Sequence, residues 1–119
     1  LVCDAGHLRA PSLSRDFVNV VTQEPVRDGR HFFEFVVHRI CDEQWCGVVV
    51  DKEQAGSSVF GGHLQGSFYY FNARCEGERR SNGERQTVHA IEDGDVIGMV
   101  IDVDACRIAF AVNGEPEFV

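Results

Sequence analysis

Residues 31–40, HFFEFVVHRI, alternate between hydrophobic and polar positions. Phe33, Phe35 and Val37 stand at every second position, and Glu34 lies between the first two. Successive side chains of a strand point to opposite faces, so a period of two indicates a strand with one buried face. This segment therefore predicts a half-buried β-strand.

Other hydrophobic runs are short, and the segments between them are polar. Residues 17–22 (FVNVVT) are rich in β-branched side chains and predict a first strand. Residues 45–50 (WCGVVV) are too few for a helix and predict a buried strand, and the aromatic residues 68–71 predict another. The Gly- and Ser-rich residues 51–67 predict a long exposed loop, and the charged residues 74–86 predict a solvated loop.

A β-hairpin is predicted around the tetrapeptide DACR, because a hydrophobic run precedes it and another follows it. With Ala105 and Cys106 as a two-residue loop, Ile101 faces Phe110 and all the apolar side chains share one face. The same register predicts buried pairs between Val103 and Ile108 and between Met99 and Val112. It also sets Asp104 opposite Arg107 as a surface ion pair.

The dipeptide Asn113-Gly114 is a strong hairpin signal at the end of this region. It predicts a type I′ turn, in which both central residues have positive φ, followed by a further strand. No helical periodicity persists beyond two turns, so we expect an all-β fold in which antiparallel strands form a two-sheet sandwich.

Composition agrees with a single domain over residues 1–119, since 44% of the residues are hydrophobic. The formal charge of −8 disfavours phosphate backbones, so we expect no nucleic-acid partner. No run approaches the roughly 18 apolar residues of a membrane span, so we expect no membrane insertion.

The five cysteines leave at least one thiol unpaired, which favours a reducing, intracellular compartment. Cys41 and Cys46 are five positions apart, which is not the C-x-x-C spacing of many zinc sites, and no second pair follows at finger spacing. We therefore expect reduced cysteines, no bound metal and no cofactor.

Four segments resemble the SPRY family, whose fold is a concanavalin A-like sandwich of two curved antiparallel sheets. GRHFFEF at 29–35 is similar to the family's opening strand, WCGV at 45–48 to its W-x-G-V strand, and GSFYY at 66–70 to its aromatic strand. The fourth segment, at 94–115, is similar to the GD-x-I-G strand, the D-x-D hairpin and the F-x-x-N-G-E turn.

The resemblance covers residues 17–119 and leaves 1–16 as a leading segment. Cys106 stands where the family generally has Gly, which predicts backbone strain if this position has positive φ. Family members usually continue past N-G-E, so we expect the C-terminal strand or strands to be missing.

Alternatives to a protein-binding domain rest on acidic residues. Residues 92–95 (EDGD) with Asp102 and Asp104 suggest calcium, but they lack the alternating oxygen ligands of an EF-hand loop. A lectin-like carbohydrate-binding domain is the second hypothesis, and a glycoside hydrolase that uses Asp102 and Asp104 is the third. The five histidines are scattered without a nucleophile motif, and Trp45 is expected in the core rather than in a ligand site.

The resemblance implies a non-catalytic module that recognises a partner protein or peptide, inside a larger multidomain chain. Such domains occur in ubiquitin ligases, channels and scaffold proteins, which implies a cytoplasmic setting. The family binds through loops at one end of the sandwich, and the matching residues here are Arg27, Asp28, Ser58, Val59 and Phe60. Phe60 has no periodic partner, so it is either a loop anchor or a recognition residue.

Overall fold

A computed structural model of the chain describes residues 2–4, 7–9, 21–39, 43–50, 68–73, 76–81 and 84–117. Within these ranges the regular elements are all β-strands. None of the described residues forms a helix long and apolar enough to cross a membrane. The all-β prediction is confirmed.

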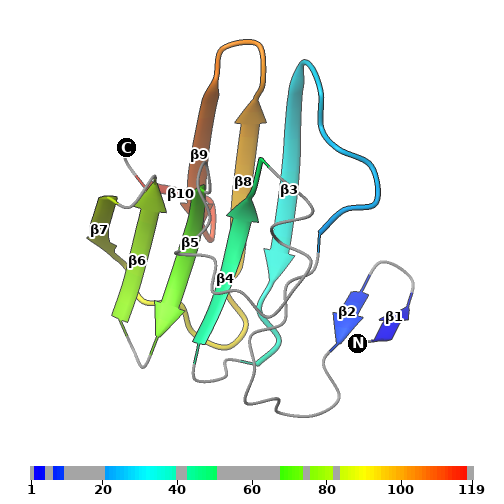
Figure 1. Cartoon of the computed structure of the whole chain (residues 1–119). Helices are drawn as coiled ribbons and strands as arrows, with labels where there is room; N and C mark the ends of the chain where they lie inside the picture. The colour runs from blue at the N-terminus through cyan, green and yellow to red at the C-terminus, as the bar shows by residue number, and fades with distance from the viewer. Residues whose placement is uncertain are drawn as a thin grey trace.

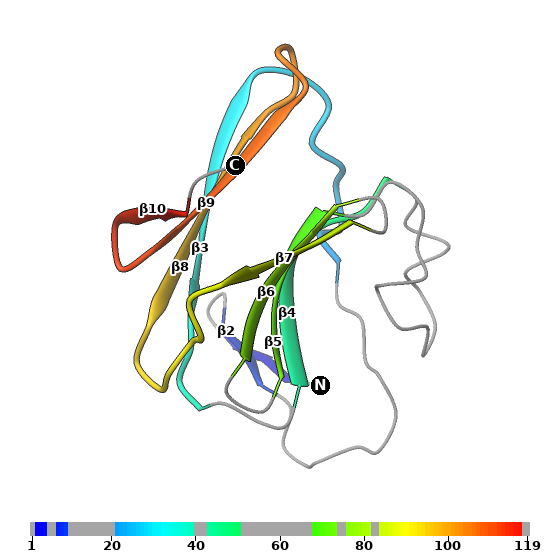
Figure 2. The ribbon, with the colours of Figure 1, turned by 90° about the vertical axis from the view of Figure 1, so that its left-hand side faces the viewer.

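The strands form two four-stranded antiparallel sheets and one small hairpin (Figure 1). Sheet I has the order β10 (Glu115–Glu117), β9 (Arg107–Val112), β8 (Val96–Asp102) and β3 (Arg30–Val36). Sheet II has the order β4 (Glu43–Val48), β5 (Phe68–Ala73), β6 (Glu76–Ser81) and β7 (Glu84–Val88). The strands β1 (Val2–Asp4) and β2 (His7–Arg9) form the hairpin. Figure 2 shows sheets I and II as two layers that face each other.

The core lies between these two layers. Its buried members come from β8, β9 and the segment before β8: Ile91, Ile97, Met99, Phe110 and Val112. Three partly buried side chains of sheet II pack against them, Cys46, Val48 and Val88. Because apolar side chains from both sheets meet there, the sandwich follows from the alternation of its strands.

The alternation predicted for β3 is confirmed. Phe33 and Phe35 are partly buried and pack against the core, whereas Phe32 and Glu34 are exposed. The strand ends at Val36, before Val37 leaves the ladder to bond residues 94 and 95. Val37 still packs against the core, as its position in the pattern predicted.

The hairpin between β8 and β9 exists, but its predicted register is wrong by two residues. Ile101 pairs with Ile108, and Phe110 pairs with Met99, so residues 103–106 form a four-residue turn. An even shift keeps the apolar side chains of both strands on their predicted face, because strand side chains alternate with a period of two. Val103, which was predicted to pair with Ile108, lies in the turn instead. Phe110 is 3% exposed, while Ile101 and Ile108 are partly buried against the core.

The larger turn has a local cause in the side chain of Asp102. Asp102 Oδ1 accepts a hydrogen bond from the Ala105 backbone N–H (2.9 Å), and the Cys106 N–H donates to the Val103 carbonyl (3.2 Å). These bonds close a turn that starts at Asp102, so Arg107 lies opposite Asp102 and not opposite Asp104. Cys106 has a φ of 52°, so a non-glycine residue adopts the left-handed conformation where the SPRY family generally has Gly.

The turn after β9 is confirmed as predicted. Asn113 has a φ of 52° and Gly114 a φ of 81°, as a type I′ turn requires. Glu115 then pairs with Val112, and β10 is the strand expected after the turn.

Three strand assignments need correction. The predicted loop at 74–86 contains β6 and most of β7, because a backbone ladder forms without apolar side chains when neighbouring strands satisfy each N–H and C=O. Val21 and Thr22 are not in a strand, since Thr22 Oγ1 donates to the Glu24 carbonyl (2.8 Å) in a local bend. The predicted strand at 45–50 ends at Val48, and Val50 is 76% exposed. Residues 17–20 and the predicted loop at 51–67 lie outside the described residues.

Trp45 does not join the core cluster that the sequence suggested for it. On β4, Cys46 and Val48 pack against that cluster, so alternation places Trp45 on the opposite face of the strand. Trp45 is half-buried there.

Candidate functional site

One end of the sandwich carries the turn that leads into β3. Gly29, with a φ of 70°, accepts a hydrogen bond from the Val103 N–H (2.9 Å) and donates its own N–H to Asp104 Oδ1 (3.2 Å). These bonds join segments 75 residues apart in sequence, and Figure 1 shows the turn beside the tip of the β8–β9 hairpin. We call this region, residues 27–31 and 102–107, the hairpin end.

An ion pair spans the same junction. Arg30 donates from Nε (3.1 Å) and from its terminal nitrogen (2.8 Å) to Asp102 Oδ2. The Arg30 hydrogen bond, followed by that of the Ala105 N–H, lowers the pKa of the Asp102 carboxyl below its usual value. Since the Arg30 side chain is 74% exposed, the pair mainly orients groups and adds little stability.

Arg27 and Asp28 are exposed next to this junction. The Asp28 carbonyl lies 2.6 Å from His31 Nε2, so the backbone is tied back while the side chains remain at the surface. Among the described residues the Arg27 guanidinium has no ion-pair partner. The structure thus places Arg27 and Asp28 together at the hairpin end; Ser58, Val59 and Phe60 lie outside the described residues.

A second network lies at the opposite end of β8. Asp95 Oδ1 accepts from Asn113 Nδ2 (2.8 Å), and Asp95 Oδ2 accepts from the Glu92 N–H (2.8 Å). Asn113 Oδ1 in turn accepts from the Val96 N–H (3.0 Å). The Asn113 bond is the main reason why the pKa of Asp95 is lowered, and the Glu92 N–H is the next.

This network explains why the GD and NG motifs occur together. The Asn-Gly dipeptide predicted only a backbone role for Asn113, whereas its side chain also bonds Asp95. The two motifs close the same end of sheet I from neighbouring segments. The presence of both motifs in one short stretch of sequence was the available signal for this network, although it did not predict which side chains would be in contact.

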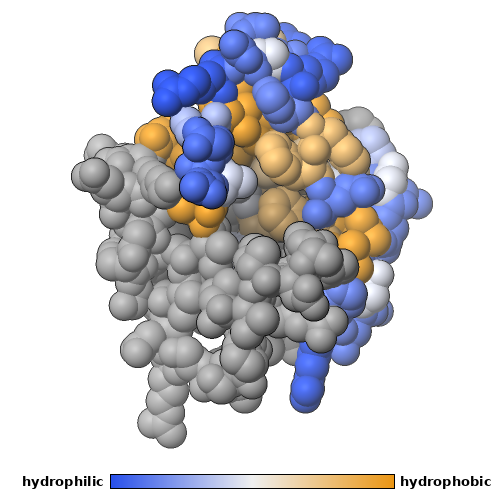
Figure 3. All heavy atoms as spheres, turned by 90° about the vertical axis from the view of Figure 1, so that its right-hand side faces the viewer, coloured by the Kyte–Doolittle hydropathy of each residue, from blue (hydrophilic) through white to orange (hydrophobic). Residues whose placement is uncertain are grey.

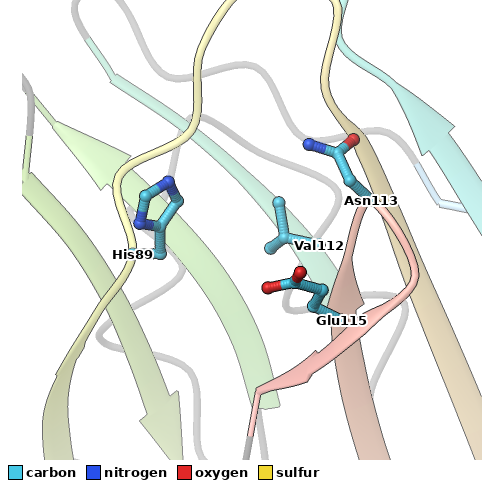
Figure 4. Close-up of a pocket in the computed structure, with 4 residues that line it drawn as sticks. All are labelled: His89, Val112, Asn113 and Glu115. Atoms are coloured by element: carbon cyan, nitrogen blue, oxygen red, sulfur yellow. The ribbon is translucent and has the colours of Figure 1, made fainter.

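A pocket of about 320 Å³ opens beside this network (Figure 4). His89, Val112, Asn113 and Glu115 line it, and Val112 is 6% exposed. The Asn113 amide is already bonded to Asp95 and Val96. The carboxylate of Glu115 also lines the pocket. This pocket could not be predicted from the sequence, because its lining comes from two segments far apart in the chain, residue 89 and residues 112–115.

The acidic residues considered for calcium or hydrolysis do not converge. Asp95 precedes β8 and Asp102 ends it, so the length of a seven-residue strand, about 23 Å, separates them. Asp102 and Asp104 both accept hydrogen bonds that hold the hairpin end together. Within the described residues, no group of three or more His, Cys, Asp or Glu side chains is arranged to hold a metal.

Cys46 and Cys106 are free thiols with different surroundings. Burial raises the pKa of Cys46 to about 12, whereas Cys106 is exposed at the hairpin tip. Cys41, the other member of the considered metal pair, lies outside the described residues.

Comparison with protein families gives one finding that covers most of these elements. The SPRY domain model matches residues 30–118, from the start of β3 to just beyond β10. No curated protein matches the chain.

Proposed function

The chain belongs to the SPRY domain family, whose members are generally protein–protein interaction modules, and we propose that it is a non-catalytic module that binds its partner at the hairpin end. The proposed contact residues are Arg27 and Asp28, together with Ser58, Val59 and Phe60 of the loop predicted at 51–67. The partner is a protein or a peptide. We further propose an intracellular, cytoplasmic setting as part of a larger scaffold or ubiquitin ligase adaptor.

One observation carries this proposal: Arg27 is exposed on a turn whose backbone is already fixed. The bonds from Gly29 to Val103 and Asp104, with the contact between His31 and the Asp28 carbonyl, order the turn before any partner arrives. A preorganised loop loses less conformational entropy on binding than a mobile one. Binding through the Arg27 guanidinium therefore costs little conformational entropy of the turn's backbone.

The chemistry of Arg27 suggests the kind of group it recognises. A guanidinium carries a planar fork of donors that matches a carboxylate or an amide oxygen. Because Arg27 has no ion-pair partner among the described residues, no internal pair has to break first. We propose that Phe60 adds the apolar contact, since aromatic residues and Arg most often dominate interface energies.

The test compares charge reversals at the two ends of β3. Tagged wild-type chain, Arg27→Glu, Phe60→Ala and Arg39→Glu are used to capture partners from a cell lysate, and the Kd of a recovered partner is then measured. Arg39→Glu is the matched control, because Arg39 is also exposed but follows the other end of β3. Arg27→Glu and Phe60→Ala are each expected to weaken binding by about 1–2 kcal/mol, roughly five- to thirtyfold in Kd.

Unfolding curves of all four proteins separate a binding defect from a folding defect. Arg27 and Arg39 are exposed, so their variants are expected to unfold close to the wild type. If the partner binds both Arg27→Glu and Phe60→Ala normally, or is lost only from Arg39→Glu, the proposed end is wrong.

A further inference from the structure

The outer face of sheet I is unusually apolar for a surface that faces away from the core. Residues opposite each other in neighbouring strands share a face, and one such row is Phe32, Val100 and Ala109. The next rows are Glu34, Gly98, Ala111 and Pro116, followed by Val36 and Val96. An antiparallel sheet with one solvated face usually alternates hydrophobic-in and polar-out, and these rows depart from that rule.

Two hydrophobic side chains of this face are highly exposed. Phe32 is 61% exposed and Val36 is 53% exposed, both on the edge strand β3. The Phe32 ring lies over Gly98, because its Cε2 atom is 3.3 Å from the point where a Cβ of residue 98 would stand. Figure 3 views the molecule from the side of the edge strand β3, so it shows the edge of sheet I rather than its outer face.

The central strands β8 and β9 present smaller side chains than β3 does. Gly98, Ala109 and Ala111 occupy three of their outward positions, beside Val96 and Val100. The Phe32 ring covers Gly98, so a partner's backbone can approach the sheet most closely over Ala109 and Ala111. We name the set Phe32, Val36, Gly98, Ala109 and Ala111 the outer patch. Glu34 lies between Phe32 and Val36 on β3, and the apolar residues continue around it through Gly98 and Ala111. Exposed apolar patches of a few hundred Å² often mark interaction sites.

Charged residues border the outer patch at the hairpin end. The next row contains Arg30, Asp102 and Arg107. Asp102 is bound by Arg30, while Arg107 is exposed and has no ion pair among the described residues. Arg107 can therefore pair with an acidic group that lies over the patch.

We propose that the outer patch binds an amphipathic helix of a partner protein, with the apolar stripe of the helix over Phe32, Ala109 and Ala111. An acidic side chain near one end of the helix pairs with Arg107. This is a second interface, which adjoins the hairpin end at Arg107 but includes none of the contact residues proposed above, Arg27, Asp28, Ser58, Val59 and Phe60.

The size of the face favours a helix over a second copy of the chain. Across β3, β8 and β9, two strand spacings give a width of about 10 Å, and seven residues give a length of about 23 Å. This rectangle of roughly 230 Å² is well below the roughly 800 Å² per partner of a standard stable interface. A helix with its side chains is about 10–12 Å wide and extends 23 Å in roughly 15 residues, which matches both dimensions.

The probe is a displayed library of 15-residue peptides built on a helix-forming sequence, with the apolar and charged positions randomised. A parallel library with Pro at position 8 cannot form the helix and serves as its control. Selected peptides are labelled with fluorescein, and their Kd is measured by anisotropy with the wild type, Phe32→Glu, Ala109→Arg and Arg107→Glu. Arg27→Glu is the control for the hairpin end.

The expected result is enrichment from the helical library alone, with about tenfold or greater loss of affinity for Phe32→Glu and Ala109→Arg. Arg107→Glu is expected to bind more weakly to those peptides that carry an acidic end. Arg27→Glu is expected to bind all selected peptides with the affinity of the wild type. Ala109 is exposed, so its variant remains informative if Phe32→Glu fails to fold.

Three outcomes overturn the proposal. The first is equal enrichment from the proline library, and the second is binding that neither outer-patch variant changes. The third is a wild-type dimer, seen by sedimentation equilibrium, that Ala109→Arg dissociates, because a second copy would then occupy the face. Since Arg27→Glu reports on the other end, failure here leaves the proposed function untouched.

Discussion

Phe110 and Phe32 form a matched pair that tests the whole arrangement of sheet I. Both are Phe residues in strands of the same sheet, but Phe110 is 3% exposed in the core and Phe32 is 61% exposed on the outer face. Replacing each by Ala removes the same atoms. The difference in destabilisation therefore reports which face of the sheet is buried.

The expected magnitudes follow from the buried area. A Phe buries about 200 Å² when fully covered, and at about 25 cal/mol/Å² this amounts to roughly 5 kcal/mol. Measured Phe→Ala changes in cores cost about 3–5 kcal/mol, so we expect that range for Phe110→Ala. About two-fifths of Phe32 is covered, which gives at most about 2 kcal/mol because unfolded chains already bury part of this surface.

The assay is urea denaturation and thermal unfolding of the wild type and the two variants, both monitored by far-UV circular dichroism. For 119 residues the unfolding entropy is about 0.25 kcal/mol/K, so Phe110→Ala is expected to lower Tm by roughly 12–20 °C. Unchanged m-values would show that the variants lose stability without losing compactness. If Phe32→Ala is destabilised as much as Phe110→Ala, the assignment of the two faces is refuted.

Two further predictions concern titratable groups. The pKa of Asp95 is lowered in the folded state, so its contribution to stability is present above the unfolded pKa of about 3.9 and is lost as pH falls through the folded pKa. The urea midpoint of Asp95→Asn should therefore fall less steeply between pH 6 and pH 3 than that of the wild type. Parallel curves for the two proteins would contradict this. Burial raises the pKa of Cys46 to about 12 while Cys106 is exposed, so in native protein at pH 8 Cys106→Ala should remove one fast-reacting thiol in a DTNB titration and Cys46→Ala none. Equal losses from both variants would show that Cys46 is accessible.

Local patterns sufficed for the elements whose residues repeat with a period of two. The alternation at 31–40 predicted β3 and its buried face, and the dipeptide Asn113-Gly114 predicted both positive φ values. These features depend on neighbours in sequence, through side-chain alternation and the freedom of Gly and Asn in the left-handed region. The SPRY resemblance rested on the same segments, and the family match confirmed it.

Long-range contacts decided what the patterns left open. The hairpin register depends on Asp102, which closes the turn through Ala105 and also binds Arg30 from a strand 72 residues away. Hydrophobicity alone permitted either register, because a shift of two residues preserves both faces. The charged strands β6 and β7 likewise exist through pairing with their neighbours, which no local composition records.

The candidate sites divide in the same way. Arg27 and Asp28 could be named from family resemblance, but only the folded chain ties their turn to the hairpin tip. The outer patch was invisible in the sequence, because Phe32 and Ala109 become neighbours only when β3, β8 and β9 pair in register. A sequence fixes which side chains alternate along each strand, whereas the order and register of strands decide which of them lie side by side, and a binding surface consists of such neighbours.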